Sequence, residues 1–301
     1  MKVTATTITG VAPGRSRLFV SDLMELVKAR LISLVLLTTG VGFYAGYRGP
    51  VDFALLLHTL LGTGLVAAGA AALNELLERE YDARMPRTAN RPLPAGRVQP
   101  DAVLVLGGTL AVSGLVYLCL LVNLITGLLG AITLVSYVFV YTPLKRITVL
   151  NTVVGAIPGA LPPLMGWTAA RGEVSVAGWS LFAILFFWQL PHFMAIAWLY
   201  RDEYAKAGFV MLPVVDPEGH RTSRHAVSHT LGLLPVSLSP FVFHMTGVFY
   251  LVGALILGAG FLWCAIQFAR ELSKPAARRL FLASIIYLPL LLGLIVMDKI
   301  R

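Results

Sequence analysis

Long apolar runs separated by short polar segments dominate the chain from residue 28 onward. A helix that crosses a bilayer needs about 20 mainly apolar residues, and most of these runs are long enough. The pattern predicts an all-α polytopic membrane protein with about nine transmembrane helices in one bundle. The predicted segments are 28–47, 52–76, 101–120, 121–142, 149–170, 176–200, 226–246, 248–270 and 279–298.

The first 27 residues differ from the rest because they are mixed polar and carry no signal-peptide pattern. Asp22 and Glu25 fit the start of a helix, where the positive end of the helix dipole favours acidic groups. We therefore expect a cytoplasmic segment, 1–27, followed by one membrane domain, 28–301.

Composition agrees with a membrane protein, since 57% of the 301 residues are hydrophobic and only 13% are charged. A soluble protein of this length could not keep so much apolar surface out of water. The formal net charge of +9 does not indicate a nucleic-acid partner, because the basic residues lie between apolar runs rather than on one soluble face.

The same basic residues predict an orientation. With the N-terminus in the cytoplasm, 20 of the 24 Lys and Arg residues lie on the cytoplasmic side of the nine predicted segments. Cytoplasmic loops of membrane proteins carry such an excess.

Three oxygen-bearing side chains recur every four residues where the second apolar run becomes polar: Asn74, Glu78 and Asp82. A four-residue step turns only about 40° around a helix, so the three share one face. They form either a solvated helix end, with its carboxylates paired to arginines, or a site for Mg²⁺ and a diphosphate. Acidic groups at a membrane helix end are costly unless they bind something, which favours Mg²⁺.

Arginines follow this stripe closely, in the segment 79–97. They are either ordinary cytoplasmic charge or a clamp for phosphate oxygens. In the second interpretation Arg87 and Arg91 hold the diphosphate and stabilise it as a leaving group, and Arg84 contributes to substrate binding.

A second polar loop, YRDEYAKAG at 200–208, follows the sixth segment as the first loop follows the second. Two charged loops at equivalent points of two four-helix units indicate a cavity between them. The loop is either solvated, with local ion pairs, or functional. If it is functional, Asp202 or Glu203 binds a second metal ion while Arg201 and Lys206 offset phosphate charge.

His192 lies within the sixth segment, directly after Pro191, which would kink the helix. The histidine is either packed and bonded to a neighbour, or it binds haem, substrate or water.

Three blocks of the chain resemble the haem O synthases (protohaem IX farnesyltransferases), a branch of the UbiA-type intramembrane prenyltransferases. The blocks are NELLEREYDARMPRTANRPLPAGRV, YTPLKRITVLNTVVGAIPGALPPLMGWTA and WQLPHFMAIAWLYRDEYAKAGFVMLPVV. The first block resembles the whole superfamily, and the other two resemble the haem branch.

This resemblance implies a nine-helix bundle with a central cavity that opens toward the cytoplasm of a prokaryotic cell. It implies transfer of a farnesyl group from farnesyl diphosphate to a vinyl group of haem b, with Mg²⁺ as the cofactor. A haem A synthase or a terminal oxidase would receive the product.

The resemblance also assigns residues. Asn74, Glu78 and Asp82 match the superfamily's first motif, N-x-x-x-D-x-x-x-D, with Glu78 in place of its middle aspartate. The second motif is richer in aspartate. When it is aligned on Gly208, Glu203 keeps one acidic position and Tyr200 and Tyr204 occupy the others. Substrate contacts are implied for Lys145, Arg146, His192, Tyr200, Arg201 and Lys206.

Three other functions compete with this one. Another prenyltransferase of the superfamily would act on a quinone precursor or a chlorophyllide-like acceptor. A transporter would also have repeated halves, but its site is expected near the middle of the membrane. A haem-binding assembly factor would bind haem without consuming farnesyl diphosphate.

Overall fold

The computed structural model describes residues 20–300, and every regular element in that range is a helix. Of the predicted cytoplasmic segment, residues 1–19 lie outside the described residues. The elements are α1 (Val20–Leu26), α2 (Ala29–Gly46), α3 (Phe53–Asp82), α4 (Pro100–Leu121), α5 (Leu124–Val135), the π-helix η1 (Ser136–Tyr141), α6 (Thr142–Leu144), α7 (Asn151–Arg171), α8 (Val176–Leu199), α9 (Arg201–Ala207), α10 (Leu212–Val215), α11 (His220–Val242), α12 (Val248–Glu271) and α13 (Lys274–Met297).

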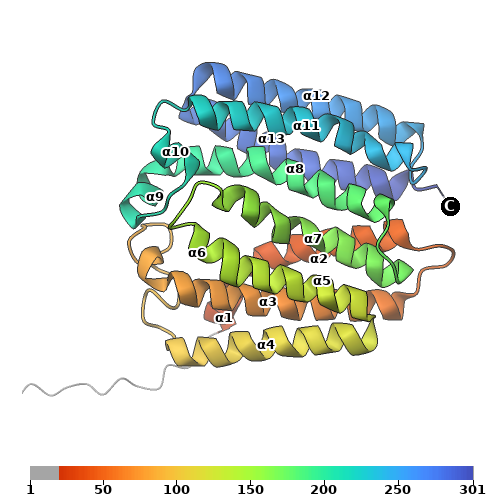
Figure 1. Cartoon of the computed structure of the whole chain (residues 1–301), viewed down its shortest axis with the longest axis horizontal. Helices are drawn as coiled ribbons and strands as arrows, with labels where there is room; N and C mark the ends of the chain where they lie inside the picture. The colour runs from red at the N-terminus through yellow and green to blue at the C-terminus, as the bar shows by residue number, and fades with distance from the viewer. Residues whose placement is uncertain (1–19, 301) are drawn as a thin grey trace, which may run out of the picture.

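The long helices lie side by side in one bundle, with the short helices α1, α6, α9 and α10 gathered at one end (Figure 1). Within the described range, eight units are long and apolar enough to cross a membrane: α2, α3, α4, the continuous α5–η1–α6 unit, α7, α8, α12 and α13. The predicted all-α membrane bundle is therefore confirmed.

The ninth long helix, α11, has the length of a membrane helix but falls outside those eight. It begins at His220, six residues before the predicted segment, and its first turns carry Arg221, Arg224 and His225. It ends at Val242, four residues early, because His244 adopts a left-handed backbone conformation with φ of 53°. Basic residues at the start of α11, together with histidines, serines and prolines further along, lower its average hydropathy.

The outer surface of the bundle is apolar, as a lipid environment requires. Leu57, Val105 and Ile256 expose about two thirds of their surface. Polar side chains such as Thr59, Thr126 and Thr168 lie fully buried between helices instead. Buried hydroxyls of this kind join neighbouring helices, as in the hydrogen bond of 2.9 Å between the Thr126 and Thr168 hydroxyls.

Close contact between α2 and α7 depends on glycine. A Cβ atom on Gly42 would collide with the backbone of Pro163, and one on Gly166 would collide with the backbone of Thr39. Small residues let membrane helices approach each other closely, where dispersion contacts hold them together.

Helix α3 is the longest element, and it positions the predicted site. The predicted apolar segment ends at residue 76, but the helix continues to Asp82. Its 30 residues span about 45 Å, which exceeds the roughly 30 Å hydrocarbon core of a bilayer. The polar last turns of α3 can therefore reach the membrane surface at the end of the bundle where the short helices lie (Figure 1).

Candidate active site

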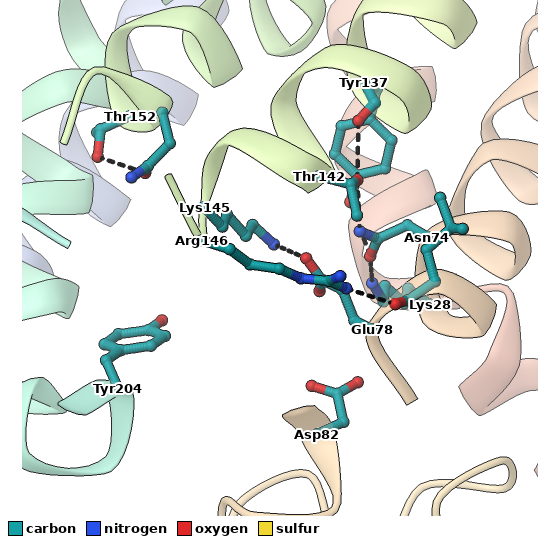
Figure 2. A network of polar contacts seen from close by, with 12 residues as sticks. Lys28, Asn74, Glu78, Asp82, Tyr137, Thr142, Lys145, Arg146, Thr152 and Tyr204 are labelled. Atoms are coloured by element: carbon teal, nitrogen blue, oxygen red, sulfur yellow. Dashed lines mark hydrogen bonds and ion pairs between the residues drawn. The ribbon is translucent and has the colours of Figure 1, made fainter. Parts of the chain in front are cut away.

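The three side chains predicted to share a face do so on α3, and all of them line one cavity of about 110 Å³. Asn74 is 0%, Glu78 4% and Asp82 1% exposed. The carboxylate of Asp82 points toward that of Glu78 (Figure 2). Two carboxylates and an amide oxygen are thus held at one end of the bundle, out of contact with bulk solvent.

Each of these side chains contacts a cation from another part of the chain. The Lys28 ammonium donates to the Asn74 amide oxygen at 2.6 Å, and the Lys145 ammonium donates to Glu78 at 2.7 Å (Figure 2). Arg91 forms an ion pair of 2.6 Å with Asp82. Buried charges are costly unless they are paired, so these contacts compensate for the loss of water around the carboxylates.

Local backbone geometry brings two of these cations to the cavity. Lys28 lies between α1 and α2 in a left-handed conformation, with φ of 53°, which ends one helix and begins the next. Lys145 directly follows the η1–α6 unit. Burial opposes its charge, but the Glu78 carboxylate raises the pKa of Lys145 above its ordinary value, so this ammonium stays protonated.

The π-helix η1 forms a further wall of the cavity with Tyr137 and Tyr141. Single turns of π-helix often occur at functional sites. The Thr142 hydroxyl donates to the Tyr137 carbonyl oxygen at 2.9 Å and accepts from the Asn74 side-chain nitrogen at 2.9 Å. This arrangement directs the Asn74 amide oxygen toward Lys28 and toward the Tyr137 hydroxyl, 3.4 Å away.

The second polar loop closes the cavity from the other half of the bundle. Tyr204 of α9 lines it together with Phe209 and Met211. Arg87 from the first loop donates to the Tyr204 hydroxyl at 3.2 Å and lies 4.7 Å from the centre of the Tyr200 ring. The structure therefore places the two predicted loops in contact and encloses a cavity between them.

These tyrosines also favour the charged form of Arg87. Burial opposes the charge, but Tyr204, Tyr200 and then Glu203 raise the pKa of the Arg87 guanidinium above its ordinary value. The first loop thus contributes two cations to the wall of the cavity, Arg87 and Arg91.

Two further arginines that were predicted to bind substrate lie outside the cavity wall. Arg84 and Arg146 both approach the Tyr81 ring, at 5.3 and 3.8 Å from its centre. Arg146 also donates to the Leu77 carbonyl oxygen at 2.6 Å. Both guanidinium groups contact the end of α3 rather than the cavity itself.

On the second loop, Asp202 is exposed and lies 3.7 Å from Lys274. Arg201 contacts the Trp198 ring at 4.5 Å, and Lys206 is exposed. Glu203 has one buried oxygen atom without a hydrogen-bond partner. A second metal site at Asp202 and Glu203 stays a prediction.

His192 lies on α8, away from the residues that line the cavity. Its Nδ1 atom is 2.7 Å from the Ser284 hydroxyl of α13, and its ring packs between Trp188 and Phe281 at centroid distances of 5.0 and 5.1 Å. The imidazole is thus bonded to a neighbour and stacked, and its predicted substrate contact stays a prediction.

The donor set of the cavity fits Mg²⁺ together with a diphosphate. Within residues 20–300, no group of three His, Cys, Asp or Glu side chains could hold a metal ion. Mg²⁺ needs no such group, because it commonly takes one or two carboxylates and completes its shell with phosphate oxygens and waters. Both carboxylate oxygens of the buried Glu75, next to Asn74, lack a hydrogen-bond partner, which adds a nearby group that favours a cation.

Sequence reasoning missed Lys28, Tyr137 and Tyr141 of the cavity wall. It also missed Thr142, which bonds to Asn74, and the buried Glu75 next to Asn74 in the chain. Only Glu75 had a usable signal, because it lies three residues before Glu78 and seven before Asp82 on the same helix.

Residues 35–288 match the UbiA prenyltransferase family. The chain belongs to this family. The family membership predicted from the sequence is therefore confirmed, and the cavity belongs to a protein of a prenyltransferase family.

Within this family, the chain is similar to curated proteins named protoheme IX farnesyltransferase. A protoheme IX farnesyltransferase of Solibacter usitatus is 48% identical over 287 residues, which are 92% of this chain and 98% of the relative. One of Koribacter versatilis is 46% identical over 92% of this chain and 93% of the relative.

Solved structures share the fold at low identity. A digeranylgeranylglyceryl phosphate synthase structure superimposes with a TM-score of 0.79 at 16% identity, over 92% of this chain and 97% of the other. The structure of a UbiA homologue of Archaeoglobus fulgidus bound to GPP and Mg²⁺ superimposes with a TM-score of 0.64 at 16% identity. The match covers 91% of this chain and 99% of the other.

Proposed function

We propose that this UbiA-family enzyme transfers a farnesyl group from farnesyl diphosphate to a vinyl group of haem b, with addition of water, to give haem O. The observation that carries the proposal is the cavity in which Asn74, Glu78 and Asp82 face basic side chains from three other segments. Carboxylates and an amide suit Mg²⁺, and lysine and arginine suit phosphate oxygens. Relatives named protoheme IX farnesyltransferase, at 46–48% identity over most of the chain, support the choice of both substrates.

In this proposal the Asn74, Glu78 and Asp82 oxygens hold Mg²⁺. When bound, Mg²⁺ neutralises charge on the diphosphate and makes it a better leaving group. Lys145, Arg87 and Arg91 approach from the other walls and bind phosphate oxygens. Positive charge that is already in place stabilises the negative charge that develops as the carbon–oxygen bond breaks.

The chemistry at carbon needs little from the protein beyond positioning and exclusion of water. Departure of diphosphate leaves an allylic cation, and the haem vinyl carbon supplies the electron pair of the new carbon–carbon bond. The cation then formed beside the porphyrin is captured by water, which loses a proton and becomes the hydroxyl group. The enclosed cavity favours this route because it shields the first cation from bulk water.

We also propose an orientation and a location for the enzyme. The described fold is that of an integral multi-pass membrane protein. The excess of Lys and Arg on one side supports a cytoplasmic N-terminus and cytoplasmic active-site loops, in the cell membrane of a prokaryote. A haem A synthase or a terminal oxidase is the proposed recipient of the product.

The test is mass analysis of haem after purified protein is incubated with haem b, farnesyl diphosphate and Mg²⁺. A farnesylated, hydrated haem that forms with Mg²⁺ and disappears with EDTA would support both the reaction and its metal dependence. Unchanged haem beside an active control enzyme would contradict the proposal. A product formed from a quinone precursor instead would assign the chain to that branch of the family.

A further inference from the structure

The first turns of α11 form an open groove that the proposed reaction does not use. Arg221, Arg224, His225 and Ser228 line this groove, whose volume is about 310 Å³. Their spacing of three, four and seven residues places them on one face of the helix. The charges that keep α11 from being apolar throughout are therefore concentrated on one surface.

These charges lack acidic partners among the described residues. Neither Arg221 nor Arg224 forms an ion pair within residues 20–300. Two nearby acids are engaged elsewhere: Asp216 accepts from the backbone and hydroxyl of Thr222 at 2.7 and 2.8 Å, and Glu218 lies 3.5 Å from His220. The groove is thus positively charged, with both guanidinium groups free to bind an anion.

The same helix becomes apolar on its outward side beyond the groove. Leu231, three residues after Ser228, is 49% exposed, and Val242 at the end of the helix is 62% exposed. Helix α11 packs on α8 and α12 along one edge of the bundle (Figure 1). Its outer surface therefore combines a basic groove at one end with apolar side chains further along the helix.

We propose that this groove binds the phosphate headgroup of an anionic phospholipid, whose acyl chains lie along α11 toward Val242. The arginine fork matches phosphate oxygens in a bidentate geometry. All four lining residues lie on α11, and both arginines are exposed. Basic residues close to a membrane surface attract anionic headgroups. This site is separate from the proposed active site, whose cavity is lined by other residues.

The test is native mass spectrometry of the purified full-length protein in neutral detergent, titrated with phosphatidylglycerol or phosphatidylcholine. We expect wild-type protein to bind phosphatidylglycerol about tenfold more tightly, since each basic residue adds to the attraction. The double variant Arg221→Ala/Arg224→Ala should lose this preference. Arg278→Ala is the matched control, because Arg278 is also exposed and lies outside the groove.

Three outcomes would overturn the proposal. The first is an unchanged lipid preference in the double variant, and the second is an equal loss in the Arg278→Ala control. The third is that haem b binds the groove through the haem carboxylates, displaces phosphatidylglycerol, and binds more tightly than that lipid does. If the double variant unfolds, Arg224→Gln alone should still weaken phosphatidylglycerol binding, and unchanged binding there would also contradict the proposal.

Discussion

At the scale of single residues, the candidate site consists of buried oxygen-bearing side chains that are each fixed by a defined contact. Asp82 is held by Arg91 at 2.6 Å and Glu78 by Lys145 at 2.7 Å. Cations and carboxylates that are already in position need little reorganisation when a charged substrate binds.

Replacing Asp82 by Asn should reduce turnover on the order of 100-fold or more, since it removes one buried charge from the proposed metal ligands. Glu80→Gln is the matched control, because Glu80 is only two residues away but its side chain is 71% exposed. Haem O formation by both variants should be measured with protein shown to be folded by thermal unfolding. Normal turnover of Asp82→Asn would refute the metal-site assignment.

Thr142 should control metal binding without contacting the metal. Its hydroxyl connects the Tyr137 carbonyl to the Asn74 amide, so Thr142→Val frees the amide to rotate. We expect the affinity for Mn²⁺, measured by electron paramagnetic resonance with a diphosphate present, to fall about 10- to 100-fold.

Thr142→Ser keeps the hydroxyl and should retain most of the wild-type affinity. Equal Mn²⁺ binding by wild type and Thr142→Val would show that the Asn74 amide needs no such support. A loss of thermal stability in both variants with unchanged Mn²⁺ affinity would indicate a purely structural role.

At the scale of elements, the functional geometry depends on how helices begin and end. Helix α3 extends past its apolar segment, η1 widens the turn that carries Tyr137 and Tyr141, and α9 is capped by Gly208 directly after its last residue. With φ of 81°, Gly208 adopts a left-handed conformation that leads the chain to Phe209 and Met211 in the cavity wall.

Gly208→Ala should therefore affect both stability and substrate binding. A Cβ atom in the left-handed region costs about 1–2 kcal/mol, and relaxation of this strain would displace the cavity wall. Gly49→Ala is the matched control, since Gly49 also has φ of 81° and open space around it but lies between α2 and α3.

Both variants should lose similar amounts of thermal stability in detergent, and only Gly208→Ala should raise the KM for farnesyl diphosphate. An equal KM for the two variants would show that the turn at Gly208 does not position the site.

At the scale of the whole molecule, the short helices lie at one end of the bundle (Figure 1). The cavity is lined from α3, from η1 and from the loops and short helix α9 that connect the long helices. The loop between α7 and α8 joins the ends of these helices farthest from the cavity, and it exposes Glu173. A proposed cytoplasmic site therefore predicts that Glu80 and Glu173 lie on opposite sides of the membrane.

A cysteine-labelling experiment checks this orientation. In a background with Cys119 and Cys264 replaced by Ser, a membrane-impermeant maleimide should label Glu173→Cys in intact cells. Glu80→Cys should be labelled only after the cells are lysed. Labelling of Glu80→Cys in intact cells would show that the protein has the opposite orientation.

The sequence by itself determined the membrane class, most of the long helices and the shared face of Asn74, Glu78 and Asp82. Each of these follows from local properties: the length of apolar runs, and the 100° rotation per residue of a helix. The basic start of α11 was visible too, although its boundaries differed because the helix begins in polar residues.

Only the tertiary structure decided which distant groups meet that face. Lys28 reaches Asn74 across 46 positions and Thr142 reaches it across 68, while Arg87 and Tyr204 meet across 117. Contacts of this kind depend on which helices pack together and on single backbone features such as the φ of Lys28 and the π-helix η1. Local sequence patterns do not indicate these contacts, because the packing between distant segments is determined only when the whole bundle folds.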